Sequence, residues 1–326
     1  MPTISLVLPT RNNEKDLPPL LDMFFSQDVD ADLEAIILDS SDDRTPEIAR
    51  EYAKKYDIKV TRVEPEDYNY GGTRNQGVRM SRGDYIVFVS TDIQVRDRKW
   101  ISKLLRHFKD PEVAGVYGRQ LPKEDAPPME EFFIQYTYPP EPKVFSLSGS
   151  LHDFFFSNTN SMIRRNVWEK IPLPEMLKSE DQEWGKRAVL AGYKIVYDPE
   201  AAVYHSHHYT LKKVFQEYFD SGATLPYVYS DPRIQRDSFI LRGLKYEYNG
   251  IKYFLKHGYA KWIPYAMLYD FMKFLGYFLG TKHKYMPLWL KRALCKKKNH
   301  WDKYDDIISE KFEFKISNSQ YRGEAL

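Results

Sequence analysis

In the stretch Tyr85-Ile86-Val87-Phe88-Val89-Ser90-Thr91-Asp92, a carboxylate follows shortly after the apolar and aromatic run 85–89. A short apolar run ended by polar residues is typical of a strand that is buried on both faces. Asp92 then lies near the carboxyl end of a strand, where open parallel sheets bind their ligands. Mg²⁺ prefers one or two carboxylates together with substrate phosphates. Asp92 is therefore a candidate metal ligand, and a polar turn is the alternative.

The same pattern recurs on both sides of this stretch. It predicts strands over 4–8, 33–38, 58–63, 154–164 and 194–197, and helices over 14–26, 45–56, 72–80 and 179–190, the last opened by a Ser cap. Apolar strands that alternate with helices imply an α/β fold with a mostly parallel sheet flanked by helices. Residues 124–142, rich in proline and acidic side chains, predict an irregular or partly helical segment and a mobile loop.

The last hundred residues have a different composition. We expect a domain over 1–225 and a helical, basic and aromatic extension over 226–326. Residues 250–298 contain eleven Lys or Arg and one acidic residue, Asp270. This excess favours an anionic partner such as a lipid headgroup, and a solvated basic face is the alternative. The apolar stretch 262–280 predicts an amphipathic helix on a membrane surface, or else a helix packed on the main domain.

Several common devices are absent from the sequence. The segment after the first strand, Pro9 to Glu14, has neither the Gly-x-Gly-x-x-Gly pattern of dinucleotide-binding folds nor a Walker-type loop. The single cysteine, Cys295, excludes an intrachain disulfide and a thiolate metal site. No secretory signal is visible, so we expect a cytoplasmic location. A net charge of only +2 gives no reason to expect a nucleic-acid partner.

Four further segments carry residues suited to chemistry. Asp39 ends the second predicted strand, where it can bind a ribose or a base, and Arg74 offers a planar fork of donors for phosphate or base oxygens. Glu180 and Asp181 form a carboxylate pair at a predicted helix start, and one of them can accept a proton from an acceptor hydroxyl. His205 and His207 alternate along an extended segment, so both can point to a metal or a phosphate. For each segment, a cap, a surface residue or an exposed cluster is the alternative.

The ordered set of motifs resembles the family 2 inverting glycosyltransferases with the GT-A fold, and most closely their rhamnosyltransferase-like subgroup. The resemblance covers about residues 3 to 225. It is carried by Gly72-Thr73-Arg74-Asn75, by Phe156-Ser157-Asn158-Thr159-Asn160-Ser161, by Ser179-Glu180-Asp181-Gln182-Glu183-Trp184 and by His205-Ser206-His207.

The resemblance implies roles for these positions. The implied donor-binding residues are Pro9, Thr10, Arg11, Asp39, Arg74, Asn75, Thr91 and Asp92. Asp181 matches the catalytic base, with Glu180 beside it. The implied metal ligands are Asp92, His205 and His207, and the implied acceptor region contains Asn158, Asn160 and Trp184. One position departs from the family pattern, because Ser90 stands where the first Asp of the Asp-x-Asp metal motif is usual.

The expected function is an inverting transfer of a sugar from a nucleotide-diphosphate donor to a hydroxyl of a lipid-linked or saccharide acceptor. The expected cofactor is Mg²⁺ or Mn²⁺, and the expected place is the cytoplasmic face of a membrane, with peripheral contact. Two alternatives remain open. A nucleotidyltransferase would usually have a Gly-rich basic loop after the first strand, and a non-catalytic sugar-nucleotide-binding protein would not release nucleotide from a donor.

Overall fold

The computed structural model of the chain describes residues 1–149, 151–234, 238–296, 298 and 301–302. In this part of the chain, no helix is long and apolar enough to cross a membrane. The predicted extension 226–326 lies partly outside the described residues.

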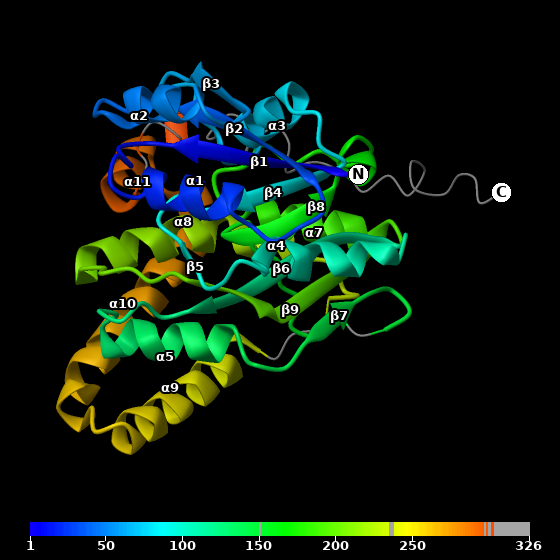
Figure 1. Cartoon of the computed structure of the whole chain (residues 1–326). Coiled ribbons are helices and arrows are strands. Elements are labelled where there is room, and N and C mark those ends of the chain that lie inside the picture. Colours follow the sequence, from blue (N-terminus) through cyan, green and yellow to red (C-terminus); the bar gives the residue numbers. More distant parts are fainter. Residues whose placement is uncertain (150, 235–237, 297, 299–300, 303–326) are drawn as a thin grey trace.

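The N-terminal half forms a parallel sheet. Strands β1 (Thr3–Thr10), β2 (Asp32–Asp39), β3 (Ile58–Arg62) and β4 (Tyr85–Val89) lie in the order β3-β2-β1-β4. The helices α1 (Leu17–Phe25), α2 (Thr45–Tyr52) and α3 (Tyr70–Met80) connect them (Figure 1). Because β2 lies on one side of β1 and β4 on the other, the strand order reverses at β1. The carboxyl ends of β1 and β4 therefore form a topological switch point, where such sheets bind ligands.

The second half extends this sheet with mixed directions. Strand β8 (Asn160–Arg164) lies antiparallel between β4 and β6 (Val113–Leu121), and β9 (Lys194–Tyr204) pairs parallel with β6. Strands β5 (Gln94–Val95) and β7 (Lys143–Phe145) pair antiparallel with β9. Helices α4 (Trp100–Leu105), α5 (Pro128–Thr137), α6 (Arg165–Trp168) and α7 (Glu180–Leu190) and the short 3-10 helix η1 (Arg106–Lys109) complete this half. The predicted α/β class with a mostly parallel sheet and flanking helices is confirmed.

Two hydrophobic clusters cover the two faces of the sheet. Val7 of β1 and Phe88 of β4 belong to one cluster, whereas their neighbours Leu6 and Val87 belong to the other. Successive side chains of a strand point to opposite faces. The uninterrupted apolar runs therefore record burial on both sides, as the sequence predicted for these strands.

Three long helices follow the sheet. They are α8 (Leu211–Val228), α9 (Phe239–Lys256) and α10 (Ile263–Thr281), and short helices η2 (Ala260–Trp262), η3 (His283–Tyr285) and α11 (Leu288–Leu294) accompany them. The predicted domain boundary between 225 and 226 falls inside α8, so no break in secondary structure marks it. The division into two domains stays a prediction.

Element boundaries differ from the prediction where tertiary context decides. The predicted strand over 154–164 is reduced to β8, and β9 continues to Tyr204 through Asp198, Pro199 and Glu200, which interrupt the apolar pattern. The segment 124–142 contains α5, which starts at Pro128, where proline fits the first helical turn. Strand β6 was not predicted at all.

Candidate active site

The carboxyl ends of β1 and β2 are held together by a buried carboxylate. Asp39 accepts hydrogen bonds from Thr10 Oγ1 at 2.9 Å and from Ser41 Oγ at 2.6 Å. Arg62 Nη1 lies 3.6 Å from Asp39 Oδ2. Asp39 is only 1% exposed. The predicted donor-binding residues Thr10 and Asp39 therefore form one rigid unit at the switch point, with Arg11 exposed beside them.

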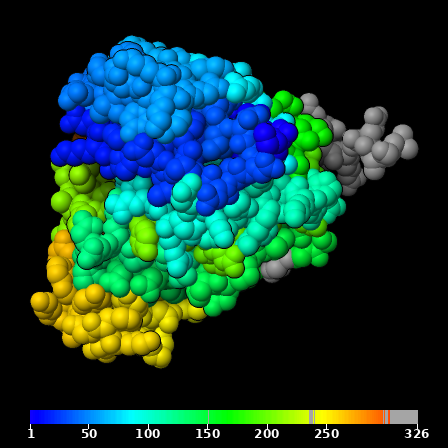
Figure 2. Space-filling model, in the orientation of Figure 1, coloured from blue at the N-terminus to red at the C-terminus, as the bar shows by residue number. Residues whose placement is uncertain are grey.

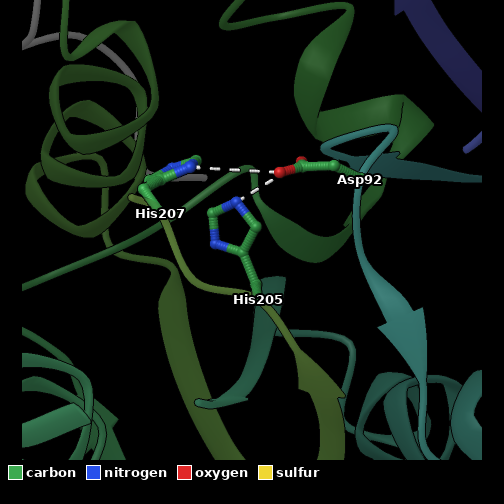
Figure 3. A group of neighbouring side chains, drawn as sticks. All are labelled: Asp92, His205 and His207. Carbon is green, nitrogen blue, oxygen red and sulfur yellow. Dashed lines mark ion pairs between the residues drawn. The ribbon is translucent and has the colours of Figure 1, made fainter. Parts of the chain in front are cut away.

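Asp92, His205 and His207 form a cluster of potential metal ligands. One ligand atom from each lies within 4.8 Å of the others (Figure 3). His205 Nε2 is 3.4 Å from Asp92 Oδ1, and His207 Nδ1 is 4.0 Å from Asp92 Oδ2. The cluster assembles because β5, just after Asp92, pairs Gln94 with Tyr204, the last residue of β9. The three predicted metal ligands thus come together from two distant parts of the sequence.

The orientation of His205 is fixed by Gln120. His205 Nδ1 lies 2.8 Å from Gln120 Oε1, and Gln120 donates through its Nε2 to the hydroxyl of Tyr138. The amide oxygen therefore faces His205, and Nδ1 carries the proton that it accepts. His205 Nε2 is left as a buried atom without a hydrogen-bond partner, and it faces a carboxylate oxygen. Two acceptors that face each other fit a bound cation, because a cation satisfies both.

The electrostatics of the cluster agree with this fit. Burial would raise the pKa of Asp92, but His205 and His207 in their protonated forms, together with Lys123, hold that pKa below its ordinary value. Burial, with the nearby His205, lowers the pKa of His207 to about 4, so its imidazole is neutral at neutral pH. An ionised carboxylate and two imidazoles suit Mn²⁺ better than Mg²⁺, which prefers oxygen ligands only.

A second group of charges lies at the start of α7. Asp181 is partly buried, and its Oδ2 accepts a hydrogen bond from the backbone N–H of Asn158 at 3.0 Å. Burial and the negative charge of Glu180 raise the pKa of Asp181 to about 7, although Arg74 and two backbone N–H groups act in the opposite direction. A carboxylate with a raised pKa near its working pH is suited to general base catalysis.

The residue before α7 differs from the prediction. Ser179 makes no side-chain cap hydrogen bond, and its φ of 67° lies in the left-handed region. That conformation is uncommon for a residue other than glycine, and it costs about 1 to 3 kcal/mol, so the surrounding structure must enforce it. The predicted Ser cap is therefore wrong, and the strained backbone sits directly before the carboxylate pair.

Arg74 is tied to this pair. Its Nη1 lies 3.1 Å from Glu180 Oε1, and both side chains are nearly buried. Its Nε is buried without a hydrogen-bond partner. The ion pair joins α3 to α7, so in this arrangement Glu180 orients Arg74. The predicted catalytic role of Glu180 and the predicted donor contact of Arg74 stay predictions.

The loops that carry Asp92 and Asp181 are directly connected. The Ser90 N–H donates to the Thr159 carbonyl at 3.2 Å, one residue after the Asn158 that holds Asp181. On the other side, Thr91 Oγ1 donates to the Pro9 carbonyl at 3.4 Å. The cluster of Asp92, His205 and His207, the carboxyl end of β1 and Asp181 are thus linked by hydrogen bonds between neighbouring residues of their loops.

The side chains of several predicted site residues bond within the protein, and their predicted roles stay predictions. Asn75 bonds through its side chain to Leu173 and Trp168, and Asn160 bonds to Trp100 and Ala201. Trp184 has no exposed surface in this structure, so its predicted place in the acceptor region stays a prediction.

Asn158 differs from these residues. Its side chain is 2% exposed, and its Nδ2 is buried without a hydrogen-bond partner. A free amide donor beside Asp181 keeps the acceptor role of Asn158 open.

Two residues at the site, Gln120 and Glu130, were not predicted from the sequence. Gln120 lies on the unpredicted strand β6, so its amide could not be related to His205. Glu130 accepts a hydrogen bond from the His207 N–H at 3.2 Å, and burial raises its pKa. The apolar run 113–117 would have indicated β6, but nothing in the sequence connects Glu130 with the histidines.

The geometry agrees with the comparisons to known proteins. The family model "Glycosyl transferase family 2" matches residues 5–171. The chain belongs to glycosyl transferase family 2. Two relatives span nearly all of this family 2 glycosyltransferase. The O-antigen chain rhamnosyltransferase RfbN of Salmonella typhimurium is 34% identical, covering 92% of this chain and 96% of its own. The O-antigen chain rhamnosyltransferase WbaN of Salmonella anatum is 33% identical over 93% and 96%.

Solved structures support the fold alone. The mannosyltransferase PcManGT from Pyrobaculum calidifontis, in complex with GDP-Man and Mn²⁺, aligns with a TM-score of 0.57 at 16% identity, covering 85% of this chain and 87% of its own. TarS residues 1–349 from S. aureus, in complex with UDP-GlcNAc, align with a TM-score of 0.52 at 16% identity, covering 86% and 91%. The GT-A expectation is confirmed. Membership in a glycosyltransferase family also removes the support for the nucleotidyltransferase alternative.

Proposed function

We propose that this glycosyltransferase moves rhamnose from a nucleoside diphosphate to an acceptor hydroxyl, with inversion at the anomeric carbon. The observation that carries the proposal is the cluster of Asp92, His205 and His207 at the switch point, linked through Ser90 and Thr159 to the loop that holds Asp181. The choice of rhamnose rests on the two rhamnosyltransferase relatives.

In the proposed reaction, Asp181 accepts the proton of the acceptor hydroxyl. The oxygen then forms a bond to the anomeric carbon, while the bond to the diphosphate breaks on the opposite side. The Asn158 N–H holds the carboxylate in place through Oδ2, and burial keeps the carboxylate basic. One displacement inverts the anomeric configuration.

Asp92, His205 and His207 would hold a divalent cation, for which their donor set favours Mn²⁺. Such a cation stabilises the charge that develops on a leaving diphosphate. The Ser90 hydroxyl replaces a usual carboxylate, so the protein site alone carries one negative charge from Asp92. We therefore propose that the cation binds tightly only together with the donor diphosphate.

We further propose that the acceptor is a saccharide linked to a lipid and that transfer takes place at the cytoplasmic face of a membrane. The saccharide acceptor is supported by the description of the two relatives as O-antigen chain rhamnosyltransferases. The membrane is supported by the basic composition of residues 250–298.

A thermal-shift panel tests the donor and the cation together. Nucleoside diphosphates carrying rhamnose, mannose, glucose or N-acetylglucosamine are each added with Mn²⁺, with Mg²⁺ or with EDTA. We expect the largest rise in melting temperature for a rhamnose donor with Mn²⁺, and a small rise with EDTA. A shift that is equal for all cation conditions would refute the metal site.

Product stereochemistry and donor hydrolysis complete the test. Retention of configuration in the isolated product would refute the single displacement. Release of nucleotide from the donor without acceptor separates an enzyme from a non-catalytic sugar-nucleotide-binding protein, which would leave the donor intact.

A further inference from the structure

Helix α9 exposes an apolar stripe instead of burying it. At about 100° per residue, its exposed apolar residues fall within one arc of about 100°. They are Ile240, Leu241, Leu244, Tyr248, Ile251 and Leu255, each at least 37% exposed. A surface helix of a globular protein normally turns such a stripe toward the core. Here the buried residues of α9 that the structure describes, Gly250 and Phe254, lie outside this arc.

Helix α10 continues this surface. Its buried side contacts α8 through Gly276 and Gly280, where an added Cβ would lie 2.3 and 2.2 Å from backbone oxygens of α8. The opposite side exposes Met267, Phe271, Phe274 and Phe278, each between 47% and 54% exposed. We call these four residues, together with the six of α9, the apolar face. The packed alternative for the stretch 262–280 therefore holds for one side of α10, while the other side exposes apolar side chains, and the membrane-surface alternative stays a prediction.

A cavity of about 900 Å³ opens between the two helices and the sheet. Ile240, Leu244 and Ile251 of α9 line it, opposite Met267 and Phe271 of α10. At its floor, Lys273 pairs with Asp270 at 2.8 Å and lies among aromatic rings, so these two charges neutralise each other. Most of the lining surface is apolar, although Arg242, Lys245 and Glu247 of α9 also line the cavity. Hydrocarbon is the occupant that the apolar walls suit.

Basic residues border the apolar face. On α9, Lys245, Lys252 and Lys256 fall on an arc directly beside the stripe, and all three are exposed. Lys261 and Lys282 are exposed at the two ends of α10. Exposed apolar side chains flanked by lysines are the pattern of helices that lie in the interface of an anionic bilayer. A second copy of the same surface would instead bring like charges together.

We propose that the apolar face docks on a bilayer containing anionic lipids, with lipid hydrocarbon entering the cavity between α9 and α10. Helix α9, which carries six of these residues, lies at one end of the molecule beside α5 (Figures 1 and 2). Helix α8, on which α10 packs, begins four residues after His207. Docking therefore holds the cation cluster at a fixed position relative to the membrane.

Co-sedimentation with vesicles tests this docking without donor or acceptor, so its outcome is independent of the proposed transfer. Vesicles of phosphatidylcholine alone are compared with vesicles that contain about one third phosphatidylglycerol. We expect wild-type protein to bind the anionic vesicles at least about tenfold better. The double variants Phe271→Ser/Phe274→Ser and Lys252→Glu/Lys256→Glu should each lose at least about tenfold in binding.

The matched charge control is Lys99→Glu/Lys109→Glu, which changes two exposed lysines near α4 by the same amount. It should bind like wild type, and melting temperatures confirm that each variant is folded. Equal binding of wild type and both face variants would overturn the proposal. A second outcome would also overturn it. In that outcome, wild-type protein does not bind vesicles, light scattering shows that it is a dimer, and the Phe271→Ser/Phe274→Ser variant is a monomer.

Discussion

The raised pKa of Asp181 makes both activity and stability depend on pH. A general base must be unprotonated, so we expect kcat/KM to fall as the pH drops through about 7, the value to which burial and Glu180 raise this pKa. Asp181→Asn should lower kcat by about 10² to 10⁴-fold, with little change in donor affinity. Transfer assays from pH 5 to 9 and donor titrations check both expectations. Wild-type turnover of the variant would exclude Asp181 as the base.

The same substitution should make the stability of the fold depend less on pH. A carboxyl group whose pKa is raised by folding binds its proton more tightly in the folded state, so its contribution destabilises the protein above the unfolded pKa of about 3.9. The melting temperature of Asp181→Asn, taken relative to that of wild type, should therefore rise between pH 4 and pH 8. Asp32→Asn, at an exposed carboxylate at the amino end of β2, serves as the control and should change neither property.

Gln120 should set the cation affinity of the cluster without touching the cation. Gln120→Leu removes the oxygen that holds His205 Nδ1–H, so Nε2 is no longer fixed toward Asp92. Loss of such an outer hydrogen bond typically weakens metal binding about 10 to 100-fold. Titration of Mn²⁺, followed by electron paramagnetic resonance with donor bound, measures the change. Tyr138→Phe, which removes only the partner of Gln120, should have a smaller effect, and unchanged Mn²⁺ affinity in Gln120→Leu would contradict the assignment.

At the residue scale, the sequence indicates which side chains carry chemistry but not what each one touches. Asp92, His205 and His207 were predicted and do converge, because strand ends and alternation along strands are local properties. Asn75, Asn160 and Trp184 lie within the recognised motifs, yet their side chains bond inside the protein. A motif contains both reacting and supporting residues, and only tertiary contacts separate them. Gln120 was missed for the same reason, since its partner is 85 residues away.

At the scale of elements, the packing of α10 on α8 depends on glycine. An added Cβ at Gly280 would lie 2.2 Å from the Phe219 carbonyl oxygen, which is backbone and cannot move aside. We expect Gly280→Ala to destabilise the protein by about 1 to 3 kcal/mol, because the helices must separate. The matched control is Gly243→Ala in α9, where nothing lies within 4 Å. That change should stabilise by about 0.5 to 1 kcal/mol. Chemical denaturation measures both, and equal effects would contradict the close contact.

Elements were predicted well where burial is uniform and poorly where it changes along the chain. Strands β1, β2 and β4 are buried on both faces, so each reads as an uninterrupted apolar run. Strand β9 contains Asp198, which is buried against Arg106 and His107. Because this polar residue interrupts the apolar pattern, the second half of the strand was not predicted. For α10, the sequence predicted either an amphipathic helix on a membrane surface or a helix packed on the main domain. It could not show which apolar side chains are buried and which are exposed.

At the scale of the whole molecule, the α/β class could be predicted because apolar strand segments alternate with amphipathic helical segments along the sequence. The antiparallel pairing of β5, β7 and β8 could not be predicted. These strands are short or follow irregular loops, so their pairing is decided by long-range contacts. The arrangement places the switch point on the sheet and the apolar face on the last helices. The active site and the proposed docking surface therefore belong to different parts of the chain, and variants can separate them.

Because the two surfaces are separate, a variant of the apolar face should affect transfer to a lipid-linked acceptor but not transfer to a water-soluble one. Phe271→Ser/Phe274→Ser leaves Asp92, Asp181 and their loops unchanged, so we expect wild-type kcat on a water-soluble acceptor saccharide. With the same saccharide on a lipid in anionic vesicles, the variant should show an apparent KM at least about tenfold higher, because docking no longer concentrates the enzyme at the surface. Raising the salt concentration should reduce the wild-type advantage on vesicles, since the lysine attraction is screened over about 8 Å at physiological ionic strength. Equal losses on both acceptors would mean that the face acts on the active site itself, and the two functions would not be separable.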